Sequence, residues 1–167
     1  GNKQNPAFVE MEKSKKLLYV IADNIRSLEN IGSIFRTADA LGVDKIFLCG
    51  ISGKPPNEKI SKTALGAEKT IPFEHYRQTW RAVDKLKKQG FQIAALEQDK
   101  KSIFYTKFKP KFPLALIIGN EVKGISQKIL KKSDKIIYLP MYGKKESLNV
   151  SVAFGIAGYE INNFRKL

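Results

Sequence analysis

Short apolar runs that alternate with helical patterns constrain the fold of this chain most strongly. The run 114–118, Leu-Ala-Leu-Ile-Ile, contains no polar residue, so both faces of the predicted strand are apolar. This is typical of a parallel strand that is buried on both faces of a sheet. The alternation predicts a single α/β domain with a mainly parallel sheet, covered by helices on both faces. We expect this domain to span 17–167, after a short polar tail at 1–16. Further strands are predicted at 17–21, 45–49, 70–73, 91–96 and 135–139, helices at 31–41, 58–65, about 80–90, 125–130 and 148–164, and loops at 50–57 and 100–113.

The composition favours a protein of the reducing cytoplasm. No apolar run approaches the length of a membrane span, and the lysine-rich start has no apolar stretch behind it, so neither an anchor nor a signal peptide is expected. Cys49 is the single cysteine, which excludes an internal disulfide, and His75 is the single histidine, which argues against a His/Cys metal site. We therefore expect a cytoplasmic protein that binds no membrane and no metal.

The charge points to a polyanionic partner. Thirty Lys and Arg residues against 16 Asp and Glu residues give a net charge of +14. A field of this sign attracts nucleic acid and speeds its encounter with the protein. An ordinary basic surface is the alternative explanation. Because lysines dominate the excess, we expect general attraction to phosphates more than the reading of bases.

Polar residues gather at predicted strand ends in three segments. The first is 30–38, Asn-Ile-Gly-Ser-Ile-Phe-Arg-Thr-Ala, where Asn30 is a good helix N-cap and Ser27 is another. Taken alone, this segment is most simply explained as the start of a helix. Arg36, near that start, could nevertheless bind a phosphate.

The second and third segments follow two further buried strands. Segment 118–124, Ile-Gly-Asn-Glu-Val-Lys-Gly, has glycines around a tight turn, so the backbone can approach a ligand at Gly119, with Glu121 at the rim. Segment 139–153, Leu-Pro-Met-Tyr-Gly-Lys-Lys-Glu-Ser-Leu-Asn-Val-Ser-Val-Ala, breaks at Pro and Gly and then restarts with small polar residues that can cap a helix. Each alone also fits an ordinary connection. In a parallel sheet, however, all three meet at the carboxyl ends of strands, where ligands bind.

Other well-known motifs are missing. No Gly-x-Gly-x-x-Gly follows the first strand, and 50–55, Gly-Ile-Ser-Gly-Lys-Pro, does not match a P-loop. A Ser-His-Asp triad is not expected when His75 is the single histidine. A plain nucleotide-binding protein would need the phosphate loop that is absent.

Taken in order, the three segments resemble the motifs of the SpoU (TrmH-like) family of RNA 2'-O-ribose methyltransferases, which belongs to the SPOUT superfamily. They are similar to its patterns N-x-G-x-x-x-R-T-A, G-N-E-x-x-G and P-M-x-G-x-x-x-S-L-N-V-S-V-A, and the resemblance runs from about Leu17 to about Phe164. It implies a deep C-terminal trefoil knot at about 115–151, S-adenosylmethionine bound in the knot, and a homodimer. The cofactor pocket that it implies is lined by Leu96, Gly119, Leu139, Met141 and Leu148.

The reaction implied by the resemblance transfers a methyl group from S-adenosylmethionine to a ribose 2'-hydroxyl of structured RNA, leaving S-adenosylhomocysteine. Arg36 is the implied catalytic residue. Because a guanidinium is hard to deprotonate, we favour a role for it in holding the neighbouring phosphate and stabilising alkoxide charge; whether it also accepts the proton stays open. Asn30 and Ser147 could position Arg36 and the ribose, and Glu121 could orient an arginine across a dimer. Asn149 matches the last polar position of the site. Since the donor is a cation, we expect apolar walls and carbonyls around it, without strong anions.

Several alternatives remain at this point. Transfer RNA is favoured slightly over ribosomal RNA, because a free-standing core of this size can grip an exposed loop. The expected lack of long basic extensions or an extra RNA-binding domain leaves room for a partner that supplies specificity. A SPOUT base methyltransferase would need a positioned general base near the donor. A catalytically inactive RNA-binding module should have lost Arg36, Asn30 or Asn149, all of which are present.

Overall fold

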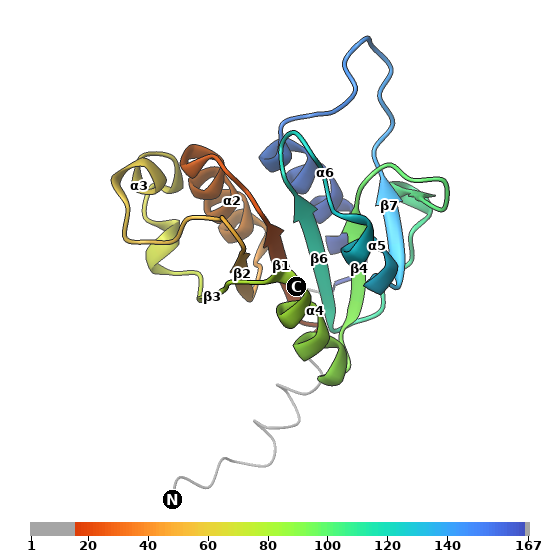
Figure 1. Cartoon of the computed structure of the whole chain (residues 1–167), viewed down its shortest axis with the longest axis horizontal. Coiled ribbons are helices and arrows are strands. Elements are labelled where there is room, and N and C mark those ends of the chain that lie inside the picture. The colour runs from red at the N-terminus through yellow and green to blue at the C-terminus, as the bar shows by residue number, and fades with distance from the viewer. Residues whose placement is uncertain (1–15, 166–167) are drawn as a thin grey trace, which may run out of the picture.

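The computed structural model describes residues 16–165, which form a seven-stranded sheet with helices packed on both sides (Figure 1). The strand order is β3-β2-β1-β6-β4-β7-β5, and every pair of neighbouring strands is parallel. The predicted α/β fold is therefore confirmed. The strands are β1 (Leu18–Asp23), β2 (Lys45–Cys49), β3 (Phe73–Tyr76), β4 (Gln92–Leu96), β5 (Ile103–Phe104), β6 (Leu114–Gly119) and β7 (Lys135–Tyr138). The helices are α2 (Leu28–Leu41), α3 (Glu58–Ala64), α4 (Thr79–Lys88), α5 (Gln127–Lys132) and α6 (Val150–Asn162), with 3-10 turns η1 (Ala67–Lys69) and η2 (Tyr105–Lys107).

The central strands place alternate side chains in two separate cores, because successive residues of a strand point to opposite faces. Leu116 and Ile118 of β6 lie in the core shared with α2 and α6, whereas Ala115 and Ile117 lie in the core shared with α4 and α5. In Figure 1, α4 and α5 cover the near face of the sheet and α2 and α6 cover the far face. Burial on both faces explains why the run 114–118 contains no polar residue.

Two strands differ from the prediction. The strand expected at 70–73 was wrong in position: β3 begins at Phe73, because the amides of Thr70 and Ile71 donate to the Ala67 carbonyl and so continue the η1 turn. The stretch 100–113, predicted as a loop, contains the two-residue strand β5, which pairs with β7 at the sheet edge. A strand of two residues in a lysine-rich and proline-rich stretch gives no periodic signal.

Caps set the ends of the helices. Ser27 is the N-cap of α2, and its hydroxyl accepts a hydrogen bond from the Asn30 amide at 3.1 Å. Of the two residues predicted as good caps, Ser27 is therefore the one that caps the helix, whereas Asn30 lies in the first turn. Gly42 ends the helix as predicted, with a φ of 68° that glycine adopts at little cost.

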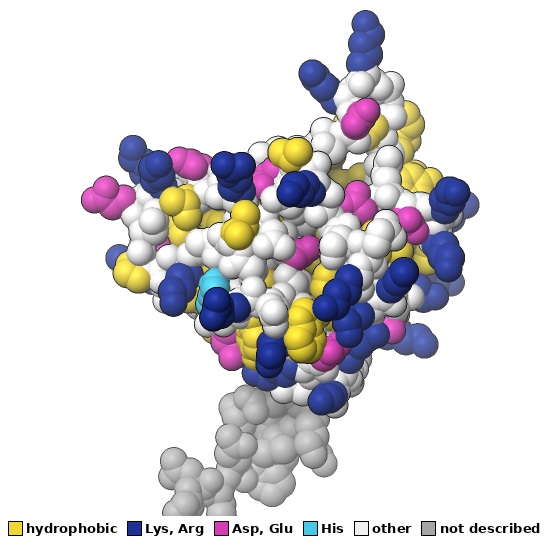
Figure 2. Space-filling model, viewed as in Figure 1, with side chains coloured by type: hydrophobic (Ala, Val, Ile, Leu, Met, Phe, Trp, Pro, Cys, Tyr) yellow, Lys and Arg dark blue, Asp and Glu magenta, His cyan; other side chains and the backbone are white. Residues whose placement is uncertain are grey.

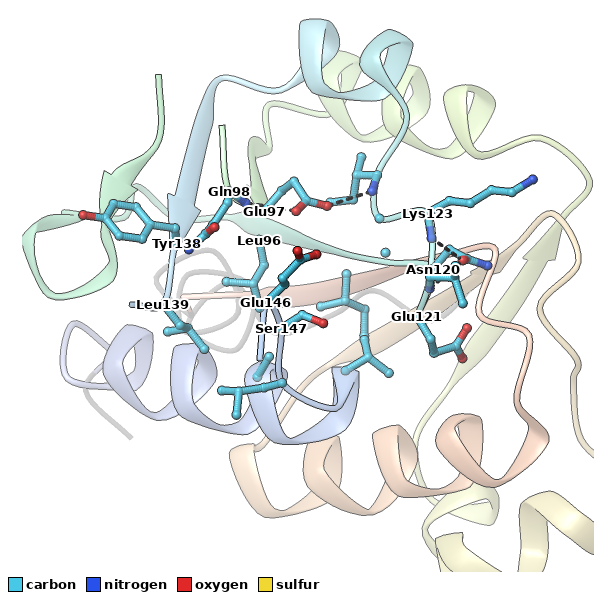
Figure 3. Close-up of a pocket in the computed structure, with 18 of the residues that line it drawn as sticks. Leu96, Glu97, Gln98, Asn120, Glu121, Lys123, Tyr138, Leu139, Glu146 and Ser147 are labelled. Carbon is cyan, nitrogen blue, oxygen red and sulfur yellow. Dashed lines mark hydrogen bonds between the residues drawn. The ribbon is translucent and has the colours of Figure 1, made fainter. Parts of the chain in front are cut away.

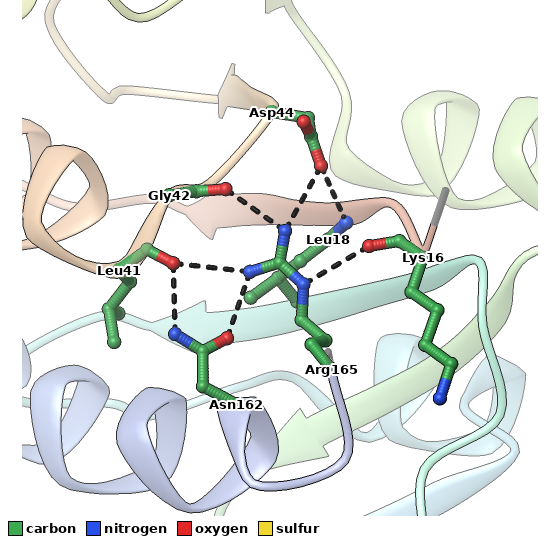
Figure 4. Close-up of polar contacts among 7 residues, drawn as sticks. All are labelled: Lys16, Leu18, Leu41, Gly42, Asp44, Asn162 and Arg165. Atoms are coloured by element: carbon green, nitrogen blue, oxygen red, sulfur yellow. Dashed lines mark hydrogen bonds and ion pairs between the residues drawn. The ribbon is translucent and has the colours of Figure 1, made fainter. Parts of the chain in front are cut away.

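A buried arginine, Arg165, holds the C-terminal ends of α2 and α6 together (Figure 4). The Arg165 guanidinium, 5% exposed, donates to the carbonyls of Leu41 and Gly42 at the end of α2 and to the carbonyl of Lys16. A carboxylate oxygen of Asp44 lies 3.4 Å away. Burial lowers the pKa of Arg165, and Asp44 opposes that effect. These contacts satisfy carbonyls that a helix leaves free at its C-terminus, so the two helices are held together at the end remote from the sheet's carboxyl edge.

Four other predictions concern the knot, membrane spans, metal sites and the N-terminal tail. The knot expected at about 115–151 stays a prediction; β6 lies between β1 and β4 in the sheet. No helix within residues 16–165 is long and apolar enough to cross a membrane. The described residues also place no three His, Cys, Asp or Glu side chains where they could hold a metal ion together. The tail predicted at 1–16 lies almost wholly outside the described residues.

Candidate active site

A cavity of about 470 Å³ opens at the carboxyl ends of β4, β6 and β7 (Figure 3). Its volume is in the range of small-molecule and cofactor sites, and its place is where parallel sheets bind ligands. Two predicted segments, 118–124 and 139–153, contribute most of its walls. The lining residues are Leu96, Glu97, Gln98, Ile118, Gly119, Asn120, Glu121, Val122, Lys123, Gly124, Ile125, Gln127, Leu130, Tyr138, Leu139, Met141, Glu146, Ser147, Leu148, Val150 and Ala153.

All five residues predicted to contact the cofactor line this single cavity. They come from three separate parts of the chain, which the sheet brings together at one edge. Ser147 and Glu121, predicted as polar site residues, line it too. A role for these side chains in binding stays a prediction. The five are Leu96, Gly119, Leu139, Met141 and Leu148.

The loop after β6 is folded tightly against itself. A Cβ on Gly119 would lie 2.9 Å from the Gly124 carbonyl carbon and 2.9 Å from the Ile125 nitrogen, so no larger residue fits without moving backbone. The close approach expected at Gly119 is therefore to the chain's own loop. Gly124 has a φ of 66°, and a Cβ there would clash with Glu97 Oε2.

Glu97 is a lining residue that the sequence did not reveal. Its Oε2 accepts a hydrogen bond from the Ile125 amide at 3.0 Å, and its Oε1 accepts one from the Gln98 amide at 3.0 Å. Glu97 thereby ties the end of β4 to the loop after β6. Glu97 follows directly after an apolar strand and belongs to none of the three motif segments. The sequence therefore gave no indication that it lines the cavity.

Glu121 is held at the start of α2. Its two carboxylate oxygens accept hydrogen bonds of 3.2 Å each from the backbone amides of Arg26 and Ser27 and from Asn30 Nδ2. Burial alone would raise the pKa of Glu121. Hydrogen bonds from its own amide, Asn30, Ser27 and Arg26 outweigh burial and lower it. A negative charge is favoured at a helix N-terminus. Within the described residues, Glu121 therefore accepts hydrogen bonds from two backbone amides and from Asn30. Any arginine side chain that it orients would have to come from another molecule.

A chain of hydrogen bonds joins all three motif segments. Asn30 of the first segment donates to Glu121 of the second, and Asn149 of the third donates from Nδ2 to Asn30 Oδ1 at 3.1 Å. Asn149 is also the N-cap of α6, with its Oδ1 accepting from the Ser151 amide at 2.9 Å. The helix consequently begins at Val150 and not at Leu148 as predicted. Asn30 and Asn149 thus lie together beside the cavity, although neither lines it.

Arg36 lies outside the cavity. It is exposed on α2 and lines a separate open hollow between α2 and α6, with Ser151 and Tyr159 among the facing residues. Among residues 16–165 the structure gives Arg36 no hydrogen bond or ion pair. Within residues 16–165 no hydrogen bond joins Arg36 to Asn30 or Ser147, and a role for these two residues in positioning Arg36 stays a prediction.

The polar groups of the cavity differ from the expectation of apolar walls without anions. Glu97, Glu121 and Glu146 all line it. The first two are occupied by backbone amides, whereas Glu146 lies on the exposed loop after β7 (Figure 3). The cavity therefore combines apolar walls, such as Leu96 and Leu139, with carboxylates whose negative charge suits a cationic ligand.

Comparisons with known proteins agree with this geometry. A model of the SpoU rRNA methylase family matches residues 17–159. The tRNA (guanosine(18)-2'-O)-methyltransferase of Aquifex aeolicus is 37% identical over 158 residues, which cover 93% of this chain and 74% of that protein. A TrmH family protein of Staphylococcus haemolyticus is 34% identical over 156 residues, covering 92% of this chain and 62% of that protein.

A solved structure shows the same fold. The AdoMet-bound rRNA methyltransferase of Sinorhizobium meliloti superposes with a TM-score of 0.84 and 27% sequence identity, over 90% of this chain and 57% of that chain. The present chain thus spans about three fifths of the length of several relatives that it matches. The family match nevertheless covers all three motif segments and every strand of the described sheet. The chain belongs to the SpoU rRNA methylase family.

Proposed function

We propose that this protein transfers a methyl group from S-adenosylmethionine to a ribose 2'-hydroxyl of RNA. The observation that carries the proposal is the cavity at the carboxyl edge of the sheet. It gathers the five predicted cofactor residues, and a hydrogen-bond chain through Glu121, Asn30 and Asn149 joins it to the first motif. The names of the Aquifex and Sinorhizobium proteins, one a tRNA 2'-O-methyltransferase and one an AdoMet-bound rRNA methyltransferase, support the same reaction.

The residues of the cavity fit the methyl donor. Apolar side chains such as Leu96, Leu139 and Leu148 would contact its uncharged parts, and carboxylates offset its positive charge. When bound, S-adenosylmethionine supplies a methyl group on a sulfonium, which is a good leaving group. The protein's task is then to orient the ribose hydroxyl and to exclude water.

Arg36 is the proposed catalytic group for the RNA side of the reaction. A guanidinium presents donors in a planar fork that can hold a phosphate in two places. Held in this way beside the ribose, its charge would stabilise the alkoxide that forms as the hydroxyl loses its proton, before that oxygen takes the methyl group and S-adenosylhomocysteine leaves. Since Arg36 is exposed and faces a hollow outside the cavity, it must meet the donor through another molecule.

A homodimer supplies that second molecule in our proposal. The outer side of α6 carries apolar side chains that remain well exposed in the single chain: Val152 at 50%, Ile156 at 40% and Tyr159 at 58%. They surround the Arg36 hollow. Pairing two copies over this surface would bury the apolar side chains and bring Arg36 of one copy toward the cavity of the other.

A cytoplasmic location belongs to the same proposal and rests on composition.

Transfer RNA is the proposed substrate ahead of ribosomal RNA. The test is mass spectrometry of nucleosides from RNA of cells that lack the gene, followed by methylation of that RNA with the purified protein and labelled S-adenosylmethionine. A lost 2'-O-methylnucleoside that the protein restores in vitro is the expected result. A lost base methylation would assign the chain to base methylation instead. Unchanged RNA together with firm RNA binding would indicate an inactive binding module.

A further inference from the structure

Two cations from different helices lie over the ring of one tryptophan. Trp80 is half-buried in the first turn of α4. The guanidinium carbon of its neighbour Arg81 lies 4.8 Å from the centre of the indole ring, and Nζ of Lys128, on α5, lies 5.1 Å from it. The negative face of an aromatic ring attracts cations. Trp80 therefore holds two like charges beside one ring.

In the described part of the chain, neither cation is paired with a carboxylate. Among residues 16–165, Arg81 and Lys128 form no ion pair; Arg81 Nε donates only to the uncharged Oε1 of Gln78, at 3.1 Å. The acid of α4, Asp84, is taken by Lys132 at 2.9 Å. The two charges over the ring are thus left for an external anion, which would also relieve their mutual repulsion.

The charge extends over both helices. α4 and α5 together carry seven Lys and Arg residues and one acid, Asp84. Figure 2, which views this side of the molecule, shows Lys and Arg side chains gathered beside an apolar patch over α4 and α5. The seven are Arg81, Lys85, Lys87, Lys88, Lys128, Lys131 and Lys132.

The basic face adjoins the cavity. α5 follows directly after the loop 119–125, and its residues Gln127 and Leu130 line the cavity while Lys128 is exposed over Trp80. Lys123, on the cavity rim, is exposed as well. A polyanion whose reacting sugar enters the cavity would thus continue over positive charge on α5.

We infer that the outer face of α4 and α5, centred on Arg81 and Lys128, is a docking surface for the sugar–phosphate backbone of the RNA substrate. This inference rests on the proposed RNA methyl transfer and names a surface for it outside the catalytic site. Phosphates accept hydrogen bonds from the guanidinium and the ammonium, and Trp80 keeps both groups in place. Contacts of this kind fix the register of the RNA and carry no sequence information.

The test compares two double variants with equal loss of charge. Arg81→Gln with Lys128→Gln removes the cations over Trp80, and Lys59→Gln with Lys62→Gln removes two exposed lysines from α3. Affinity for an unmodified tRNA transcript is measured from 50 to 200 mM salt. Loss of two phosphate contacts makes the slope of log affinity against log salt shallower by about 1.8. The factor by which affinity falls between 50 and 200 mM salt should therefore be about twelvefold smaller for the first variant than for wild type. At 50 mM salt it should bind more weakly than wild type, and the α3 variant should resemble wild type.

A further variant tests the ring separately from the charge. Trp80→Leu keeps every cation but removes the surface that gathers Arg81 and Lys128, so tRNA affinity should fall severalfold. Trp80→Phe keeps a ring and should restore most of it. Melting temperatures confirm that each variant is folded, and unchanged affinity in folded Trp80→Leu would overturn the role of the ring.

The outcomes separate this inference from the proposed function. Labelled S-adenosylmethionine reports methyl transfer in the same samples, and the rate at saturating RNA should be unchanged in Arg81→Gln with Lys128→Gln. If wild type methylates RNA but the two double variants bind alike, the docking surface is refuted alone. If wild type methylates no RNA while the variants still differ in binding, the proposed function fails and the docking surface stands. Tighter binding of polyglutamate than of tRNA at this face would show an acidic protein partner and would overturn the inference.

Discussion

The cavity and the Arg36 hollow lie near each other but differ in completeness. The walls of the cavity are held in place by hydrogen bonds within one chain. Glu97 accepts a hydrogen bond from the Ile125 amide in the loop after β6, and Glu121 joins that loop to the start of α2. The hollow, by contrast, holds an exposed arginine without a partner in the described chain, beside the exposed apolar side chains of α6. The cavity is thus formed within the single chain, whereas the hollow leaves its arginine free to bind another molecule.

This difference suggests how the proposed reaction is controlled. Holding a long arginine side chain in one conformation costs up to about 2 kcal/mol of side-chain entropy. In the proposed mechanism a free Arg36 would defer that cost until RNA or a second copy supplies a partner, so methyl transfer would require the complete assembly. A preformed cavity, in turn, should bind S-adenosylmethionine without RNA. The two regions can therefore be separated by mutation.

The largest effect is expected at Arg36. Arg36→Ala should lower the single-turnover rate of methyl transfer by about 10²- to 10³-fold, the usual cost of one donor that stabilises developing charge. Calorimetry should find nearly unchanged affinity for S-adenosylmethionine, because Arg36 does not line the cavity. Arg77→Ala, which removes another exposed arginine, is the control.

Arg36→Lys refines the same comparison. If Arg36 works by gripping phosphate in two places, Lys should be almost as damaging as Ala. A rate that Lys largely preserves, and that rises with pH, would instead indicate a titrating base. Full activity of the Ala variant would remove Arg36 from the mechanism.

The next largest effect should come from the apolar surface of α6. Ile156→Asp places a charge among side chains that the proposed dimer buries, and a loss of about 2 kcal/mol would raise the dimer dissociation constant about thirtyfold. Methyl transfer should fall with dimer content in sedimentation, while S-adenosylmethionine affinity is retained. Ile51→Asp, at a side chain 63% exposed elsewhere, should change neither. A wild-type monomer at micromolar concentration would contradict the dimer itself.

A smaller effect is expected inside the cavity wall. In Gly119→Ala the new Cβ would meet the backbone of Gly124 and Ile125 at 2.9 Å, so the loop must shift, at a cost of about 1–3 kcal/mol. Affinity for S-adenosylmethionine should fall about tenfold, since about 1.4 kcal/mol corresponds to a factor of ten. Gly143→Ala, where a Cβ meets nothing within 4 Å, is the matched control. Equal affinities for both variants would show that the shape of this loop does not govern donor binding.

The two regions also differ in what the sequence revealed. The strand ends that form the cavity were predictable, because fully apolar runs specify buried parallel strands and their carboxyl ends specify the edge where ligands bind. The side-chain contacts at that edge were not predictable. Glu97 lies in no motif, and the hydrogen bond from Asn149 to Asn30 joins residues 119 positions apart in the sequence. Ser27 and Asn30 were both predicted as good caps, and only the fold decides that Ser27 caps the helix. The strand at 70–73 failed for a similar local reason, the η1 turn before it.

The smallest expected effect concerns Glu121, which links the cavity to the first motif. Glu121→Gln keeps the size of the side chain but loses the charge that the Arg26 and Ser27 amides and Asn30 stabilise. At neutral pH we expect a melting temperature lower by about 2–4 °C, the shift for about 1 kcal/mol in a domain of this size.

The pH dependence of that difference has a definite sign. Because the hydrogen bonds lower the pKa of Glu121 in the folded protein, the charged form contributes stability above the ordinary carboxyl value of 4.5, and the contribution is lost as pH falls through the lowered value. The gap between wild type and Glu121→Gln should therefore be full at pH 6–7 and should close as the pH falls below about 4.5. Glu58→Gln, at an exposed position on α3, provides the reference. A gap that widens on acidification would mean that the charged carboxylate does not stabilise the folded chain, and that the chain of contacts from the cavity to Asn30 and Asn149 depends on shape alone.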